Sequence, residues 1–482
     1  MRKLHRRDVL ENIGAGALAL PFLGGGAAAQ AAERPNILFI LADDMGYADV
    51  GCYGRPDIKT PAIDGIAAAG TRFLQAYANS AVCSATRTAL ITGRYQDRLR
   101  IGLEEPLAGN PNVGLPPSHP TLPSLLKKVG YSTTLIGKWH LGAAPKFGPL
   151  LSGYDHFYGF RGGALDYFRH TDPAGHPDFW DDNVPISRHG YLTNLLGDRA
   201  VETVRTAARG SAPFLLSLHF NAPHWPWEGP GDEAESARLD GTNLWDFDGG
   251  NQRIYEAMIT DLDYQVGRVL QALEETGLAS NTIVIFTSDN GGERFADVWP
   301  FTGMKTELLE GGLRIPAIIR WPGRIPAGRI FHQVAISMDW LPTLLAAAGT
   351  TPDPAYPSDG VDLLPLLTRG GPEISRSLFW RYKANAQRAA RVGDYKYLKI
   401  IDNGFLFDVV DDPQERANLK QRHRDIYERL VADWFAWNAA MLPEVAESYT
   451  DAFTGRELAN HIGAQPVGMQ PDNPGSVPSP DD

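Results

Sequence analysis

Four stretches of the chain share one pattern, in which an unbroken run of apolar residues is followed at once by polar ones. They begin at Asn36 (NILFILADD), Ser132 (STTLIGKWHLG), Phe214 (FLLSLHFNAPHWP) and Thr282 (TIVIFTSDNGG). Continuous apolar runs are typical of parallel strands that are buried on both faces, whereas strands with one wet face alternate apolar and polar residues. The four stretches therefore predict strands of a mostly parallel sheet.

The segments between these strands predict helices, for example TLPSLLKKVG at 121–130 and the stretch 255–278. Strands that alternate with helices indicate an α/β fold, here a large mostly parallel sheet flanked by helices. In open sheets of this kind, ligands bind beyond the carboxyl ends of the strands. All four polar clusters fall at such ends, so we expect them to meet in one site.

The pattern changes after GTTPDPAYPSDG at 349–360, a Pro- and Gly-rich break. Beyond it, SLFWRYK, RAARVGDYKYLKI and GFLFDVV predict short antiparallel strands, and HRDIYERLVADWFAWNAAM predicts a helix. We therefore predict a catalytic α/β domain over 33–357 and a smaller α+β domain with a short antiparallel sheet over 358–445. The composition of 446–482 predicts a flexible tail.

Residues 1–32 predict an export signal. Arg6 and Arg7 stand in a basic stretch, which is followed by a short Gly-rich apolar run and by the small residues AAAQAA. This arrangement is typical of a twin-arginine signal peptide. A membrane anchor is the alternative, but the run is too short to span a bilayer. We expect export to a bacterial periplasm, without stable membrane insertion.

The charge balance restricts the partners. The 45 Lys and Arg residues are outnumbered by 57 Asp and Glu residues, which gives a formal net charge of −12. Nucleic acid is therefore not an expected partner, because phosphate backbones bind to basic surfaces. An anionic small substrate remains possible, since an acidic protein can still contain a local cationic pocket.

Carboxylates stand at two of the four strand ends. Asp43 and Asp44 follow the first strand, and Asp289 and Asn290 follow the last. One such pair alone would indicate a turn, because Asp and Asn favour turns. Two pairs at equivalent ends would bring three carboxylates and an amide together, and these would repel one another unless a cation lay among them. Hard oxygen ligands of this kind suggest calcium or magnesium.

Basic side chains stand at the same predicted edge. Each one alone would most simply be a solvated surface residue, but together they suit a tetrahedral oxyanion such as sulfate or phosphate. Imidazole groups add the capacity for proton transfer near neutral pH. The residues concerned are Arg87, Lys138, His140, His224 and Lys305.

Cys83, one of two cysteines, precedes a predicted short helix that has Ser84 at its start and Gly93 at its end. A helix N-terminus favours negative charge, so a thiolate nucleophile is physically reasonable here. The spacing to Arg87 is shorter than a Cys-dependent phosphatase loop requires. A buried, inert cysteine is the other interpretation.

The stretch CSATRTALITGR resembles the signature of the formylglycine-dependent (type I) sulfatases, Cys-x-Pro-Ser-Arg followed by Thr-Gly-Arg. Ala85 stands where Pro is usual, which is an accepted variant, and Thr86 stands where Ser is usual. The resemblance extends from Asn36 to about Met441, through LADDMGYADVGCYG, GKWHLG, APHWP, SDNGG and GMKTELLEGGLRIP in family order. It implies an arylsulfatase-like enzyme with an alkaline-phosphatase-like fold.

In that family a maturation enzyme oxidises the cysteine to formylglycine, and the hydrated aldehyde is the nucleophile. The resemblance implies one calcium ion, with these ligands: Asp43, Asp44, Asp289, Asn290 and residue 83. Arg87 and Lys138 would steady the hydrated aldehyde, and His140 would take a proton from it. His224 and Lys305 would hold the sulfate and assist the leaving oxygen.

Two other functions are alternatives to that of a sulfatase acting on aryl or carbohydrate sulfates. Phosphonate monoester and phosphodiester hydrolases of the same superfamily typically carry Asp-His where this chain has Asp289-Asn290. A non-catalytic sugar-binding homologue would have lost a site residue, and none is missing. The loop 161–182 and the loop that carries Trp225, Trp227 and Trp245 would either contact a saccharide or aryl substrate or form loop core.

Overall fold

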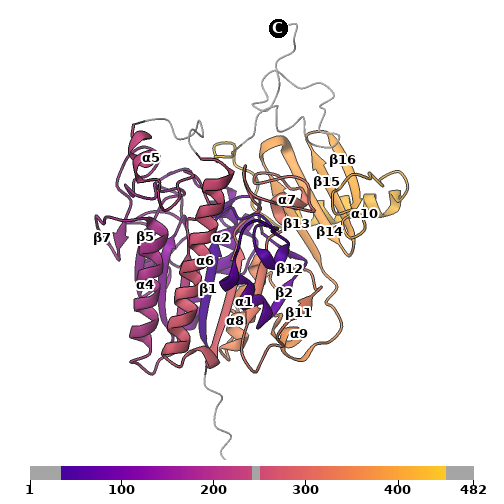
Figure 1. Ribbon diagram of the computed structural model, residues 1–482. Helices are drawn as coiled ribbons and strands as arrows, with labels where there is room; N and C mark the ends of the chain where they lie inside the picture. Colours follow the sequence, from indigo (N-terminus) through magenta and orange to yellow (C-terminus); the bar gives the residue numbers. More distant parts are fainter. Residues whose placement is uncertain (1–33, 242–249, 452–482) are drawn as a thin grey trace, which may run out of the picture. The chain divides into compact units, whose positions relative to one another are not determined.

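The computed structural model describes residues 34–241 and 250–451, which are coloured in Figure 1. The predicted export signal at 1–32, Trp245 and the part of the predicted tail after Asp451 lie outside the described residues. Within the described part of the chain, no helix is both long and apolar enough to cross a membrane.

The main sheet has the strand order β11-β2-β10-β9-β1-β8-β4-β5-β6-β7. Its five central strands run parallel to one another. They are β9 (Thr282–Ser288), β1 (Asn36–Ala42), β8 (Phe214–His219), β4 (Ser132–Lys138) and β5 (His156–Phe160). The four strands predicted from the sequence are therefore direct neighbours, and their carboxyl ends share one edge.

Antiparallel pairs occur toward the two edges of this sheet, while its five central strands are parallel, so the prediction of a mostly parallel sheet is confirmed. On one side β10 (Ala317–Arg320) runs antiparallel to β9 and to β2 (Thr71–Phe73), and β11 (Arg329–Phe331) runs parallel to β2. On the other side the short hairpin of β6 (Trp180–Asp181) and β7 (Val184–Pro185) follows β5. A separate pair is formed by β3 (Ala76–Tyr77) and β12 (Ala335–Ile336).

The side chains of β1 point alternately into two apolar cores, which explains its unbroken apolar run. Leu38 and Ile40 belong to the core formed with α1 (Pro61–Ala68), α4 (Leu192–Ala207) and α6 (Gln252–Glu275). Ile37 and Phe39 belong to the opposite core. The helices on that side are α2 (Cys83–Thr92), α3 (Leu122–Lys127), α8 (Trp340–Ala347) and α9 (Leu364–Arg369).

The predicted C-terminal sheet is present. It is antiparallel, in the order β13 (Ser377–Tyr382), β14 (Gln387–Val392), β15 (Tyr395–Ile400) and β16 (Asn403–Asp408). The helix α10 (Arg424–Ala439) packs on β14 and β15. A third apolar core joins this sheet to Tyr77 and to Ala85 and Ala89 of α2. The domain boundary at 358 stays a prediction.

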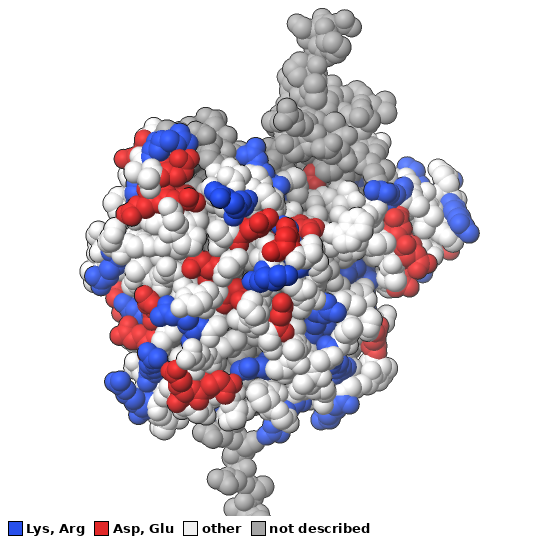
Figure 2. All heavy atoms as spheres, in the orientation of Figure 1, with Lys and Arg blue, Asp and Glu red and all other residues white. Residues whose placement is uncertain are grey.

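Two short helices complete the set, α5 (Glu233–Arg238) and α7 (Glu310–Leu313). On the face of the molecule drawn in Figure 2, acidic and basic side chains are interspersed. The basic residues predicted to line the site are buried inside the molecule.

Candidate active site

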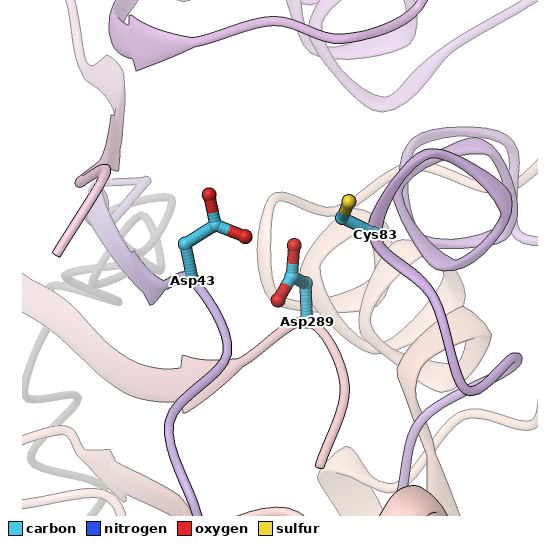
Figure 3. A group of neighbouring side chains, drawn as sticks. All are labelled: Asp43, Cys83 and Asp289. Atoms are coloured by element: carbon cyan, nitrogen blue, oxygen red, sulfur yellow. The ribbon is translucent and has the colours of Figure 1, made fainter. Parts of the chain in front are cut away.

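The two acidic pairs meet because β1 and β9 are neighbours. The backbone N–H of Asp44 donates to Oδ1 of Asp289 over 3.3 Å, and Nδ2 of Asn290 donates to Oδ1 of Asp44 over 2.7 Å. Figure 3 shows the carboxylates of Asp43 and Asp289 and the sulfur of Cys83 pointing toward one space. The structure therefore brings together the three carboxylates and the amide predicted to converge.

The donor atoms of this cluster fit a hard metal ion. Ligand atoms of Asp43, Cys83 and Asp289 lie within 4.8 Å of one another, and so do those of Asp43, Asp44 and His224. Oδ1 of Asp43 and Oδ1 of Asn290 are buried without a hydrogen-bond partner. Carboxylate and amide oxygens are ligands that calcium prefers, and an orphaned buried oxygen is costly unless a ligand satisfies it.

Each carboxylate is paired with one buried cation. Nζ of Lys138 lies 2.6 Å from Oδ2 of Asp43, and Nζ of Lys305 lies 2.6 Å from Oδ2 of Asp44. Arg87 reaches Oδ2 of Asp289 with Nη2 at 2.8 Å and with Nε at 2.9 Å. The three carboxylates are therefore matched one to one by cations, and a bound divalent cation would add positive charge toward an anionic substrate.

The pKa values of the carboxyls follow this pairing. Burial raises the pKa of Asp43 well above its ordinary value, and Lys138 offsets this only in part. Burial also raises the pKa of Asp289, but Arg87 and Lys138 outweigh it and hold that pKa below the ordinary value. Asp289 is thus the more firmly ionised member of this pair.

Both predicted histidines are neutral bases. Burial, together with Lys305, holds the pKa of His224 well below its ordinary value, and burial and Lys138 do the same for His140. Nδ1 of His224 lies 2.6 Å from the carbonyl of Trp225, and its Nε2 lies 3.3 Å from Nζ of Lys305. A ring nitrogen beside a carbonyl is the protonated one, so Nε2 of His224 is free to accept from Lys305.

His140 has the complementary arrangement. Its Nε2 lies 2.9 Å from the carbonyl of Leu107, so Nε2 carries the proton and donates. Its Nδ1 is buried and has no hydrogen-bond partner. A Cβ atom at Gly163 would lie 2.6 Å from the imidazole, so only glycine fits against this ring. The ring of His140 is therefore fixed in place, and the lone pair of its Nδ1 is free to accept a proton.

Cys83 is the first residue of α2, and it is buried. Burial raises the pKa of its thiol to about 11, although Lys138 and Lys305 pull it down. A thiol with such a pKa is almost entirely protonated near neutral pH and is a poor nucleophile. This argues against the interpretation of Cys83 as a plain thiolate.

The start of α2 differs from the prediction that Ser84 caps it. The cap position is Val82, without a side-chain cap, while Gly93 ends the helix as predicted, in a left-handed conformation with φ 67°. Ser84 Oγ instead accepts from the backbone N–H of Leu107 over 2.8 Å. The hydroxyl of Ser84 thus joins the start of α2 to Leu107, whose carbonyl also contacts His140.

Three residues of the site have left-handed backbone conformations that the sequence did not predict. They are Asp44 (φ 61°), His140 (φ 56°) and Thr306 (φ 72°). Such conformations cost roughly 1 kcal/mol or more and persist only where the surroundings hold them. Here the backbone N–H of Lys305 donates to the carbonyl of Gly292, and that of Thr306 donates to Ala81, each over 2.9 Å.

Two further residues, which the sequence did not predict, contact Lys305 or the backbone beside it. Oε2 of Glu293 lies 3.6 Å from its Nζ. Gln387, on β14, donates from Nε2 to the carbonyl of Thr306 and accepts at Oε1 from the N–H of Leu308, each over 2.9 Å. Gln387 is about eighty residues from this segment, so no local sequence signal pointed to it.

The aromatic residues proposed for substrate contact divide into two groups. Trp225 and Trp227 are buried, with 6% and 4% exposure, which favours the loop-core interpretation for them. In the loop 161–182, Tyr167 and Phe179 are also buried. Trp180 is only partly buried and remains available.

Comparison with known proteins assigns the family. The Sulfatase family model matches residues 35–350, and that of the N-sulphoglucosamine sulphohydrolase C-terminal region matches 304–434. The chain therefore belongs to the sulfatase family and has the alkaline-phosphatase-like fold. It is a sulfuric ester hydrolase, an enzyme that hydrolyses sulfate esters.

Individual relatives agree. N-acetylgalactosamine-6-sulfatase of Rattus norvegicus is 35% identical over 404 residues, 79% of this chain and 74% of that protein. Arylsulfatase A of Homo sapiens is 33% identical over 421 residues, 80% of this chain and 79% of that protein. Both are named as sulfatases, which agrees with the family assignment.

Solved structures show the same architecture. The crystal structure of Ps i-CgsB in complex with k-i-k-neocarrahexaose has a TM-score of 0.77 and 28% identity, and covers 87% of this chain and 95% of that one. The phosphonate monoester hydrolase of Agrobacterium radiobacter has a TM-score of 0.60 and 22% identity, with 84% and 96% covered. The second likeness concerns the fold alone.

Proposed function

We propose that this sulfatase acts through formylglycine formed from Cys83, with one calcium ion, on sulfate esters of saccharides or aryl alcohols. The observation that carries the proposal is the buried sulfur of Cys83 beside three carboxylates and three cations. Burial also raises the pKa of its thiol to about 11, which disfavours a plain thiolate nucleophile. Converted to an aldehyde by a maturation enzyme, residue 83 would offer the hydroxyls of its hydrate as the nucleophile.

The calcium ligands would be Asp43, Asp44, Asp289 and Asn290, with residue 83 beside them. The orphaned oxygens of Asp43 and Asn290 support this assignment. When bound, the ion supplies positive charge that stabilises negative charge on the sulfuryl group.

The side chains around residue 83 then have separate tasks. Arg87 and Lys138, fixed by their carboxylate partners, would orient the hydrate and bind sulfuryl oxygens. Nδ1 of His140 would take the proton from residue 83, because its lone pair is free and its ring is held at Nε2. This role needs a neutral imidazole, which burial provides.

Lys305 and His224 would assist the departure of the leaving oxygen. Burial lowers the pKa of Lys305, but Asp44 and Glu293 outweigh it and hold that pKa well above the ordinary value. Lys305 therefore stays charged and would stabilise the departing oxygen, and it also donates to Nε2 of His224. His224, hydrogen-bonded at both ring nitrogens, would position Lys305 and the sulfate.

A sulfated saccharide is the proposed natural substrate. The relatives include proteins named for N-acetylgalactosamine-6-sulfate, and one structural neighbour was solved with a neocarrahexaose. Both names refer to sugars, and the first also to a sulfatase. An aryl sulfate would serve as a model substrate with a better leaving group.

The choice between sulfate and phosphonate rests on Asn290. Its amide is neutral and donates to Asp44, so it has no proton to give to a leaving group as an imidazolium would. We expect kcat/KM for an aryl sulfate to exceed that for the phosphonate monoester with the same leaving group by at least about tenfold, roughly 1.4 kcal/mol. Equal rates, or a preference for the phosphonate, would contradict the sulfate assignment.

The nucleophile is tested by peptide mass spectrometry of active enzyme. We expect residue 83 as an aldehyde, and no turnover from Cys83→Ala. Cys83→Ser is the matched variant, because it supplies one hydroxyl where the hydrated aldehyde has two. Full activity from enzyme that carries only the unmodified thiol would refute the formylglycine proposal.

Two proposals concern the whole chain. We propose export through the twin-arginine route, supported by Arg6 and Arg7 before the weak apolar run. We also keep the division into domains over 33–357 and 358–445, supported by the change from parallel to antiparallel strands.

A further inference from the structure

A groove of about 500 Å³ lies between the loop that follows β4 and the loop that follows β5. Its lining includes apolar side chains and three groups that can bind a polar ligand. The residues used below are Pro145, Phe147, Leu151, Arg161, Trp180 and Asn183. None of them belongs to the cluster around Cys83.

Arg161 is a fixed cation without an acidic partner. Its guanidinium lies 3.9 Å from the centre of the Trp180 ring, and Nη2 donates to Oδ1 of Asn183 over 2.9 Å. Its Nε is buried and has no hydrogen-bond partner. Within the part of the chain that the structure describes, no carboxylate forms an ion pair with it.

The nearest acid, Asp178, is engaged elsewhere. Its oxygens accept from the backbone N–H groups of Arg161 and Gly162 and from Nε1 of Trp180. The carboxylate thus shapes the loop and orients the indole. Its charge acts on the guanidinium, but burial outweighs it and holds the pKa of Arg161 below its ordinary value, while Arg161 lines the groove. A fixed guanidinium of this kind is suited to a sulfate or carboxylate oxygen.

The remaining surface suits a sugar ring. Trp180 is partly buried, and Leu151 is 47% exposed beside Pro145 and Phe147. Sugar sites combine apolar and aromatic walls with a few polar groups that fix the orientation. The groove has both features, because Asn183 and Arg161 stand at its polar end.

The two loops that border the groove also hold the proposed base. The backbone N–H of His140 donates to the carbonyl of Arg161 over 3.2 Å. Two residues further on, Gly163 packs against the imidazole of His140. The groove and the proposed base are therefore neighbours in the fold, as a subsite next to the scissile sulfate requires.

We propose that this groove is a subsite for a second, anionic sugar of the oligosaccharide whose scissile sulfate lies at residue 83. The occupant is a sugar ring that carries a sulfate or a carboxylate, with the ring on Trp180 and the oxyanion on Arg161. The proposal rests on the proposed function, and it narrows the substrate to polyanionic saccharides.

Three substrates test it: a sulfated disaccharide with a second anionic group, the same disaccharide without that group, and an aryl sulfate. Arg161→Ala should lower kcat/KM for the first substrate, relative to the aryl sulfate, by about tenfold or more, mainly through KM. Arg161→Lys should lose less kcat/KM than Arg161→Ala, because lysine keeps the positive charge. It should not match the wild-type enzyme, because it lacks the two parallel donors of the guanidinium. Trp180→Leu should weaken the binding of both disaccharides. Comparing disaccharides whose second anionic group is a sulfate or a carboxylate shows which of the two oxyanions the groove binds.

Arg324→Ala is the matched control. Its guanidinium lies 5.8 Å from the centre of the Trp321 ring, and Trp321 follows β10, on the other side of the sheet from β5 and β6. This variant also loses a stacked arginine, but outside the groove. Its ratio of disaccharide to aryl sulfate activity should equal that of the wild-type enzyme.

The outcomes separate the subsite from the proposed function. An equal loss on all three substrates in Arg161→Ala, or no loss on any, would overturn the subsite. A wild-type enzyme that releases sulfate from none of the three substrates would overturn the proposed function instead. Calorimetry on Cys83→Ala then still tests the groove, since the anionic disaccharide should bind more tightly than its neutral counterpart, and equal affinities would refute the proposal.

Discussion

Removing the metal should destabilise the protein by an amount that can be stated in advance. The perturbation is exhaustive chelation, followed by return of calcium, magnesium or buffer alone. The structure predicts a response because two buried oxygens, on Asp43 and Asn290, have no hydrogen-bond partner. Calcium would satisfy them, and its loss would leave them orphaned.

The size of the effect follows from linkage. Calcium at a hundredfold excess over its Kd would stabilise the folded state by about 2.7 kcal/mol. Unfolding a chain of 482 residues gains entropy of roughly 1 kcal/mol per kelvin, at about 2.1 cal/mol/K for each residue. Chelation should therefore lower the Tm by about 3 °C and abolish turnover, and calcium should restore both.

Two variants separate the metal from the ion pairs. Asp289→Asn also breaks the buried pair with Arg87, which costs about 3 to 5 kcal/mol whether or not calcium is present. Asn290→Ala leaves every charge in place and removes one proposed ligand and its hydrogen bond to Asp44. We expect Asp289→Asn to lose stability that calcium does not restore, and Asn290→Ala to need about tenfold more calcium.

The assay is thermal unfolding and aryl sulfate turnover, measured on the same samples after elemental analysis. An unchanged Tm and unchanged turnover in a preparation shown to be free of metal would refute the metal assignment. A calcium titration of Asn290→Ala that matches the wild-type curve would remove Asn290 from the ligand set while leaving the metal itself in place.

Three further changes test other parts of the structure. Gln387→Leu should slow poor leaving groups more than good ones, because it frees the backbone beside Lys305; equal losses in kcat would mean a purely structural role. Burial raises the pKa of Glu105 to about 8, so the folded state holds its proton and loses stability as pH rises to that value, by about 1.4 kcal/mol per unit. The Tm of Glu105→Gln should therefore vary less between about pH 5 and 8, and an equal slope would contradict this. Lysine at both Arg6 and Arg7 should leave precursor in the cytoplasm on cell fractionation, whereas normal delivery would favour the general secretory route.

The strands that carry the site were predictable because each is buried on both faces. An unbroken run such as NILFILA needs apolar surroundings on either side, and β1 lies between β8 and β9 with helices on both faces. The order of the strands was not predictable. Crossover connections make neighbours of strands far apart in the sequence, and β6 and β7 are too short to leave a pattern.

The site residues were predictable by type and by strand end, but their support was not. Asp44 and His140 have left-handed backbones, and nothing in the local sequence demands this of a histidine. The backbone that follows Lys305 is held by Gln387 of β14, in the C-terminal sheet, through Thr306 and Leu308. These features depend on contacts between distant segments, which residue patterns do not record.

The pairing of charges explains how one set of residues can serve both folding and catalysis. A buried carboxylate without a partner is costly, so a chain that must fold before calcium binds needs cations of its own at each acid. Lys138, Arg87 and Lys305 provide them, one for each carboxylate. Calcium would take over the neutralisation of the acids, which would leave the three cations facing the sulfate. The cations that neutralise the acids before calcium binds would thus become the anion receptor once it is bound, with no side chain required to move far.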